Sequence, residues 1–229
     1  MTTATKVSIS SNTLDLLKNF ASINSNILIK PGKKIKTISN YKNVLAEAEV
    51  EEVFDTPFGI WDLHKLLGTI SLFENPTFEF HEKHMVIEAE NGATVTYFYS
   101  EPKLLTTMDK ELNMPPHVVE CYIKSDDFKE VQRAASVLQL PDLKISSNGD
   151  KIELIIHDRK DPSSNSYSFE VGENTGNADF DFLFKVENMK MLPGDYTVRI
   201  CENSVAKFSS DDINLTYWVA MEPDSKYSG

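Results

Sequence analysis

Apolar residues recur at helical spacing in two segments of the chain, residues 12–23 and residues 126–137. Three or four positions separate them, which places one apolar stripe along an amphipathic helix. We therefore predict a helix in each segment, and we expect Asn12 to cap the first one. The apolar positions of the two segments correspond when the sequence is shifted by 114 positions: Leu14 with Phe128, Leu17 with Val131 and Ala21 with Ala135.

Short alternating segments follow each helix and predict strands. A turn that contains glycine separates two such segments in both halves, which is typical of a β-hairpin. The first predicted hairpin joins 27–30 to 35–38 through Pro31-Gly32, and the second joins 143–146 to 152–156 through Asn148-Gly149.

Each half then continues with two short strand patterns, a second short helix and three closing strands. The second helices are predicted from Asp62 and from Glu187, the latter ending before Pro193-Gly194. The closing strands are predicted at 77–80, 85–90 and 94–99 in the first half, and at 196–201, 205–209 and 215–221 in the second. The same order of elements occurs twice, so the chain is predicted to be a duplicated α+β unit.

Residues 101–117 show no sustained period and contain Pro102, Pro115 and Pro116. We expect an extended connector here, between a domain at 1–100 and a second at 118–229. Its apolar residues exceed what a solvated linker needs, so part of the connector is expected to pack on a neighbouring sheet.

The chain of 229 residues carries a formal charge of −12 and is 41% hydrophobic. This charge would repel DNA from most of the surface, so binding to nucleic acid requires the cations to gather on one face. No membrane span or signal peptide is expected. Cys121 and Cys201 fit no paired spacing and are expected to be buried thiols.

Cations follow acids along every predicted helix. This order is what the helix dipole favours on any solvated helix, so alone it does not indicate a partner. The exposed cations beyond the first turns are Lys18, Lys65, Lys129, Arg133 and Lys190.

No catalytic or metal-binding motif stands out. His81 and His84 form His-Glu-Lys-His, which lacks the spacing of a zinc motif and falls at a predicted strand turn. Asp126-Asp127 and Asp211-Asp212 are adjacent pairs whose side chains diverge. We expect no enzyme activity, metal or cofactor.

Four sequence segments, in order, carry a resemblance to a known family. They are N-T-L-D-L-L-K-N-F-A-S-I-N (Asn12 to Asn24), V-E-N-M-K-M-L-P-G-D-Y (Val186 to Tyr196), A-K-F (Ala206 to Phe208) and Y-W-V-A-M-E (Tyr217 to Glu222). The chain resembles the DNA polymerase sliding clamps of T-even-type bacteriophages from about Ser10 to Ser225.

The resemblance implies a homotrimeric ring with two similar domains per subunit, sheets outside and helices lining the hole. It also implies sequence-independent encirclement of double-stranded DNA, an ATP-driven clamp loader and binding of the DNA polymerase carboxyl terminus. A role as a mobile activator of late transcription and a place in the cytoplasm of the infected bacterial host follow from it too. By position, Lys18, Lys65, Lys129, Arg133 and Lys190 are then the candidates to face DNA.

Two surfaces are expected for protein contacts. A subunit interface would pair the strand of Thr94, Val95, Tyr97 and Tyr99 with that of Tyr167, Phe169 and Val171. A groove for partner peptides is expected at Leu104, Leu105, Met108 and Met114 of the connector with Trp218, Ala220, Met221 and Pro223, and we favour the second domain as its owner.

An acidic, duplicated scaffold that binds proteins without encircling DNA is the alternative interpretation. The mass in solution separates the two, because only the ring requires three chains.

Overall fold

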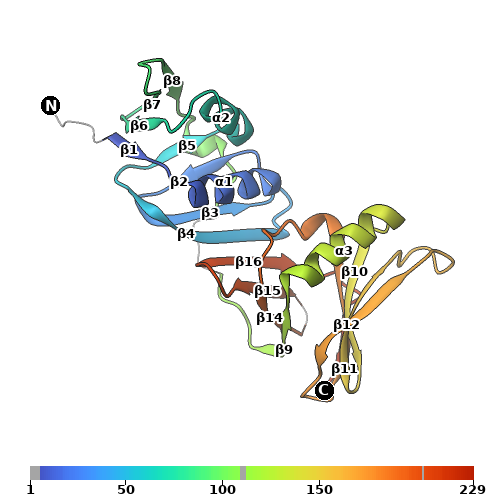
Figure 1. The fold of residues 1–229 in the computed structure, drawn as a ribbon. Helices are drawn as coiled ribbons and strands as arrows, with labels where there is room; N and C mark the ends of the chain where they lie inside the picture. The colour runs from blue at the N-terminus through green and yellow to red at the C-terminus, as the bar shows by residue number, and fades with distance from the viewer. Residues whose placement is uncertain (1–5, 109–111, 203) are drawn as a thin grey trace. The chain divides into compact units, whose positions relative to one another are not determined.

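The computed structural model describes residues 6–108, 112–202 and 204–229, and the chain divides into two compact units, 1–111 and 112–229. The predicted connector spans the boundary between these units. The first unit contains, in order, β1 (Lys6–Ser8), α1 (Ser11–Ile23), β2 (Ile27–Ile29), β3 (Gly32–Ile38), β4 (Val44–Phe54), β5 (Phe58–Ile60), α2 (Leu63–Ile70), β6 (Thr77–Phe80), β7 (His84–Glu88), β8 (Thr94–Phe98) and the 3-10 turn η1 (Pro102–Leu104) (Figure 1).

The second unit repeats this order with two differences: the 3-10 turn η2 stands in place of the second helix, and the strand β17 follows the closing strands. It contains β9 (His117–Ile123), α3 (Ser125–Leu138), β10 (Asp142–Asn148), β11 (Lys151–His157), β12 (Tyr167–Glu173), β13 (Asp179–Lys185), the 3-10 turn η2 (Val186–Asn188), β14 (Tyr196–Cys201), β15 (Val205–Ser210), β16 (Leu215–Ala220) and β17 (Lys226–Ser228). The predicted duplicated α+β architecture is therefore confirmed.

The first helix begins slightly earlier than predicted. Ser10, rather than Asn12, is the N-cap, and its hydroxyl accepts a hydrogen bond from the Thr13 amide at 3.2 Å. The Asn12 side chain instead donates to Glu51 at 3.2 Å. The prediction of Asn12 was wrong because a serine two positions earlier satisfies the same free amide groups.

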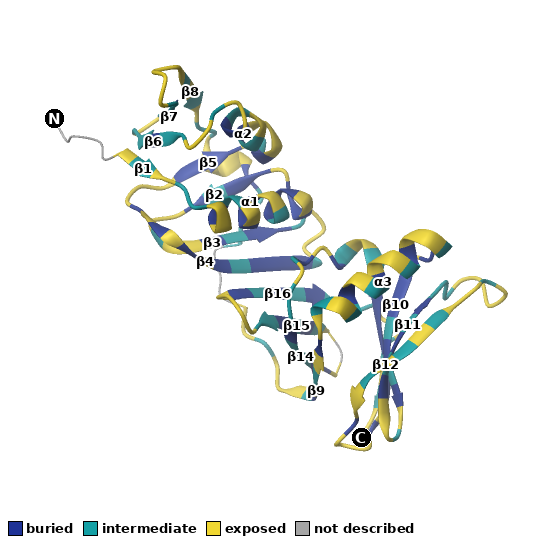
Figure 2. Cartoon of the chain, viewed as in Figure 1, coloured by how far each residue is buried: buried dark blue, intermediate teal, exposed yellow. Residues whose placement is uncertain are grey.

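Helices α1 and α2 lie against each other in the first unit (Figure 1). Phe20 of α1 and Leu63 of α2 are 0% and 1% exposed. Asp62 caps α2 by accepting from the Lys65 amide at 2.9 Å. The buried stripe of each helix faces strands, and its polar stripe remains exposed (Figure 2).

The first predicted hairpin is wrong in its pairing. Gly32, with φ of +112°, does turn the chain, but β2 pairs with β5 and β3 pairs with β4. The second predicted hairpin is confirmed, with β10 and β11 antiparallel around Gly149 at φ of +129°. Both predicted hairpins have a glycine in the turn, so the turn alone does not determine the pairing. The two halves differ because β2 joins the distant strand β5 instead of β3.

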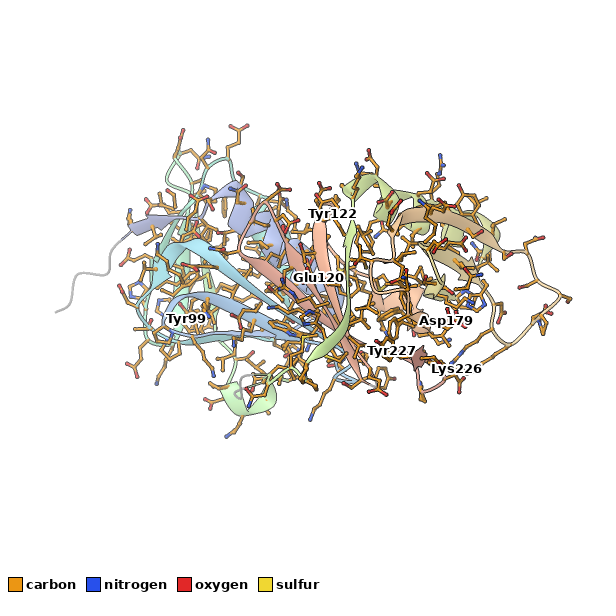
Figure 3. The ribbon with its side chains drawn as sticks, turned by 90° about the horizontal axis from the view of Figure 1, so that it is seen from below. Tyr99, Glu120, Tyr122, Asp179, Lys226 and Tyr227 are labelled. Carbon is orange, nitrogen blue, oxygen red and sulfur yellow. The ribbon has the colours of Figure 1, made fainter. Side chains whose placement is uncertain are left out.

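In the second unit, α3 packs its apolar face on strands far along the chain. The ring of Phe128 lies 5.5 Å from that of Tyr196 and 6.1 Å from that of Phe208, both edge-on. The closing strands form the antiparallel order β9-β14-β15-β16, while β12-β11-β10-β13-β17 form a second sheet. The terminal strand β17, not predicted from the sequence, lies beside β13, where Figure 3 labels Asp179, Lys226 and Tyr227.

The predicted helix from Glu187 is absent from the second unit. This segment forms only the short turn η2, and Met189 and Met191 are 2% and 7% exposed. Burial of methionines only two positions apart is incompatible with one face of an α-helix, and Pro193 limits its length. Lys190 is therefore exposed on a non-helical segment.

Candidate nucleic-acid interface and partner surface

The predicted DNA-facing cations of the first unit project from α1 and α2. Lys18 has a side chain that is 63% exposed, and its Nζ lies 2.8 Å from Oδ1 of Asp15. Lys65 is also exposed, and Asp62, three residues earlier, accepts from its amide. Each lysine thus has an acid one turn earlier on the same helix.

Helix α3 repeats this arrangement twice. The Lys129 Nζ lies 2.8 Å from Asp126, and an Arg133 guanidinium nitrogen lies 3.3 Å from Glu130. The two cation side chains are 60% and 74% exposed. Exposed pairs of this kind contribute little to stability, so a cation can exchange its carboxylate for a phosphate at small cost.

Helices α1, α2 and α3 and their N-caps together carry no net charge. Five cations (Lys18, Lys65, Lys124, Lys129 and Arg133) stand against five acids (Asp15, Asp62, Asp126, Asp127 and Glu130). The helical surface is therefore neutral within a chain of charge −12, which is less repulsive to DNA than the remaining surface but not strongly attractive.

The start of α3 is held by one acid that lies outside the helix, Asp195. Asp195 accepts from the Ser125 amide at 2.8 Å and from the Tyr122 hydroxyl at 2.6 Å. Tyr122 projects from β9, two positions after Glu120 (Figure 3). The hydrogen bonds from Tyr122 and Ser125 lower the pKa of Asp195, so this carboxylate is ionised at neutral pH. The orientation of α3 is thus set by its first turn.

Both predicted subunit-interface strands lie at sheet edges. Strand β8 ends the order β1-β6-β7-β8, and β12 ends the five-stranded sheet. Of the predicted residues, Thr94 is exposed, whereas the others are half-buried on the inner face: Val95, Tyr97, Tyr99, Tyr167, Phe169 and Val171. The sequence interpretation missed Phe98, whose side chain on the outer face of β8 is 70% exposed.

The connector is held against the first unit by its first residues. Leu105 is 8% exposed and packs against Gly59, where an added Cβ would meet Leu105 Cδ1 at 2.6 Å. The Thr106 amide donates to the Asn26 side chain at 2.9 Å. Leu104, by contrast, is 59% exposed. Leu105 thus serves to seal the connector rather than to offer a free surface.

A hollow of about 260 Å³ lies between the next connector residues and the sheet of the first unit. Met108 lines it together with Leu28, Ile38 and Leu45, which form its apolar part. Only Met108 among these four was predicted. The others could have been found from the register, since Ile38 and Leu45 are paired opposite each other on β3 and β4.

The remaining wall of this hollow is basic. Lys30, Lys34 and Lys36 line it, and among the described residues no acid does. Lys34 and Lys36 both contact Glu47, at 3.0 Å and 2.6 Å, so one carboxylate is shared between two cations. Burial would raise the pKa of Glu47, but hydrogen bonds from the two lysines lower it overall. Lys34 and Lys36 therefore hold the shared Glu47 carboxylate ionised beside the hollow.

The other predicted groove residues belong to the second unit. Trp218 and Ala220 are half-buried on one face of β16, and the Lys207 ammonium lies 5.8 Å from the Trp218 ring centre. Met221 and the connector's Met114 are half-buried, and Pro223 is exposed.

A charged cluster fixes the segment that carries Met221 and Pro223. Arg159 pairs with Glu222 and, at 3.0 Å, with Asp224. It also donates its amide to Asp142, whose side chain is 1% exposed and lies 2.5 Å from Lys185. Burial would raise the pKa of Asp142, but the hydrogen bonds from Lys185 and Arg159 lower it overall. The cluster stays charged at neutral pH.

The rings of His81 and His84 stack at 4.6 Å. No group of three or more potential ligands able to hold a metal occurs among the described residues. Cys201 is buried, while Cys121 is half-buried and burial raises the pKa of its thiol to about 12. Within the described segments, no helix has the length and apolarity to cross a bilayer.

Comparison with known proteins identifies the family of this chain. Residues 120–223 match the family described as gp45 sliding clamp, C terminal. The chain is 30% identical over 226 residues to the sliding clamp of Enterobacteria phage T4, covering 96% of this chain and 98% of that one. It is 29% identical over 216 residues to the sliding clamp of Vibrio phage KVP40, covering 92% and 97% of the two chains. The solved structure of A. fulgidus PCNA bound to the C-terminal region of FEN-1 shares the fold, with a TM-score of 0.72, 11% identity and coverage of 96% and 99%. The chain therefore belongs to the gp45 sliding clamp family.

Proposed function

We propose that three copies of this chain close into a ring around duplex DNA and tether the replicative DNA polymerase to it. The observation that carries the ring is the pair of half-buried edge strands, β8 in one unit and β12 in the other. An unpaired edge leaves backbone groups free for another strand. Head-to-tail pairing of β8 with β12 of the next copy would use both of these edges in every subunit and close the assembly.

The charge distribution supports sliding rather than tight binding. The helices offer exposed cations whose contacts with acids are easily exchanged, which suits contact with phosphates that is independent of sequence. In a closed ring, retention depends on topology, so weak phosphate contacts suffice. The acidic remainder of the surface would keep DNA from binding elsewhere.

Partner proteins are proposed to insert an apolar peptide into the hollow beside Met108, with the polymerase carboxyl terminus as the principal ligand. Its apolar part offers Leu28, Ile38 and Leu45, and unbranched methionine adapts to different side chains. The neighbouring lysines favour a peptide that carries a carboxylate near its apolar anchor. Trp218, Ala220, Met221 and Pro223 of the second unit, which the sequence favoured as the owner of the groove, stay a separate candidate surface.

Loading by an ATP-driven clamp loader, activation of late transcription and action in the cytoplasm of the infected bacterial host belong to the same proposal. These roles are compatible with a tether that accepts several peptides in turn. A few buried apolar side chains provide a few kcal/mol, as exchangeable partners require.

The ring is tested by mass in solution. Three chains of 25.9 kDa give about 78 kDa. Sedimentation equilibrium should report this mass at micromolar concentration, and Phe98→Glu together with Tyr97→Glu on β8 should shift it toward the monomer. A mass that stays monomeric at all concentrations would favour the scaffold alternative instead.

The peptide site is tested with a synthetic polymerase carboxyl-terminal peptide. Met108→Glu should weaken binding about tenfold or more, because it puts a charge in the apolar part of the hollow. Leu72→Glu is the matched control, since Leu72 is 71% exposed on a different part of the first unit. Met221→Glu tests the predicted contribution of the second unit. Unchanged binding in both Met108→Glu and Met221→Glu would move the site elsewhere.

A further inference from the structure

The two ion pairs of α3 have the same spacing but different surroundings. Asp126 is 90% exposed and contacts Lys129 at 2.8 Å. Glu130 is 35% exposed and contacts Arg133 at a longer 3.3 Å. The difference has a visible cause, because Glu130 has a second partner.

That partner is Tyr167, whose hydroxyl donates to the same Oε1 atom of Glu130 that Arg133 contacts. Tyr167 begins β12, the edge strand of its sheet, and its ring lies 5.9 Å from that of Phe169. The hydrogen bond to Glu130 raises the pKa of Tyr167, so its hydroxyl keeps the proton that it donates. One carboxylate oxygen therefore connects the sheet edge to a cation on the helix face.

We propose that Glu130 is a positioning residue that divides its carboxylate between Tyr167 at the subunit edge and Arg133 at the DNA face, so that subunit contact and phosphate contact are linked. The inference rests on the proposed ring. When β12 is paired with the next subunit, Tyr167 is held in place and occupies Glu130, which leaves Arg133 available to a phosphate. When that edge opens, Tyr167 gains freedom and Glu130 competes for Arg133.

The linkage is reciprocal, as for any two contacts that depend on one group. Phosphate contact by Arg133 releases Glu130 to Tyr167 and favours the arrangement in which β12 is ordered. Closed rings on DNA would thus be favoured over open ones. Lys129 lacks this connection, because in the described parts of the chain no tyrosine hydroxyl donates to Asp126.

The experiment uses the full chain above the concentration at which it is trimeric, with trimer mass checked by sedimentation. Binding of a short fluorescent DNA duplex is measured by anisotropy at low salt. Tyr167→Phe, which removes only the hydroxyl, should weaken duplex binding about threefold without changing the mass. In a Glu130→Gln background, Tyr167→Phe should have no further effect. In the matched Asp126→Asn background, it should retain its full effect.

Two results would overturn the inference while leaving the ring intact. One is unchanged duplex binding in Tyr167→Phe. The other is an equal loss in the Glu130→Gln and Asp126→Asn backgrounds, which would mean that Tyr167 acts without Glu130. Failure of the unaltered chain to form trimers, or to bind duplex at all, would instead contradict the proposed function.

Discussion

Cations occur in two different arrangements in this clamp. On the helices each one follows an acid by three residues, so the surface is neutral. In and before β3, Lys30, Lys34 and Lys36 line one hollow, and Lys34 and Lys36 share the Glu47 carboxylate. The difference corresponds to the two uses of positive charge that we propose: transient contact with a polymer that must slide, and specific contact with a short ligand.

The largest effect should come from reversing charge on α3. Lys129→Glu with Arg133→Glu changes the charge by −4 per chain and −12 per ring, because each substitution exchanges +1 for −1. We expect binding to a DNA duplex at low salt to fall by roughly 100-fold, because phosphate binding depends on counterion release. Thermal unfolding should hardly change, since both side chains are exposed.

The same variant should lose DNA binding but keep peptide binding. The affinity for the polymerase peptide, measured by calorimetry, should match that of the unaltered clamp. A parallel loss of peptide binding would mean that the helix face and the hollow are not separate surfaces.

The buried ion pair of Asp142 and Lys185 should contribute more to the free energy of unfolding than the exposed pairs of the helices. Asp142→Asn should lower the free energy of unfolding of the second unit by about 2 kcal/mol, because it leaves Lys185 and Arg159 without their buried partner. Asp224→Asn is the control, as Asp224 is 75% exposed, and should cost less than about 0.5 kcal/mol. Denaturant titration measures both.

The same pair predicts a pH dependence. The pKa of Asp142 is lower in the folded state than its ordinary value of 3.8. The contribution of the ionised Asp142 to the free energy of unfolding is therefore present at neutral pH. It declines as the pH falls below about 4, through the lowered pKa. Asp142→Asn should lose this part of the acid sensitivity. An unfolding curve with the same pH dependence in both proteins would contradict this role.

Neutralising the basic wall of the hollow should have a moderate effect. Lys34→Gln with Lys36→Gln should weaken binding of a carboxylate-bearing peptide about tenfold and reduce its salt dependence. A peptide with its acids replaced by amides should bind both proteins equally. Separate versions with a free and an amidated carboxyl terminus would identify which carboxylate is contacted.

The smallest effect tests the neutrality of the helices. Asp15→Asn with Asp126→Asn leaves Lys18 and Lys129 without their acids and should strengthen duplex binding about threefold, with a steeper dependence on salt. The free energy of unfolding should change by less than about 0.5 kcal/mol per site. Weaker DNA binding in this variant would show that these acids support the cations instead of competing with phosphate.

Local patterns predicted the helices and most strands of this clamp, since a periodic stripe determines which face is buried. They gave the wrong partner for β2, because its partner β5 is about 30 positions away. They also predicted a helix at η2, where both Met189 and Met191 are buried. The connector's Met108 was predicted, but the lysines of the hollow were not. Their convergence depends on the pairing of β3 with β4 and on Leu105 packing at Gly59, and neither is local.

We propose that topology, rather than charge, retains this clamp on DNA. The most direct measurement follows labelled clamp loaded onto a nicked circular plasmid, at about 0.5 M salt, before and after one cut that makes the DNA linear. We predict that the clamp stays on the circle, leaves the cut DNA, and stays on cut DNA whose ends are blocked by bound protein. Release from the circle as fast as from linear DNA with open ends would contradict the account.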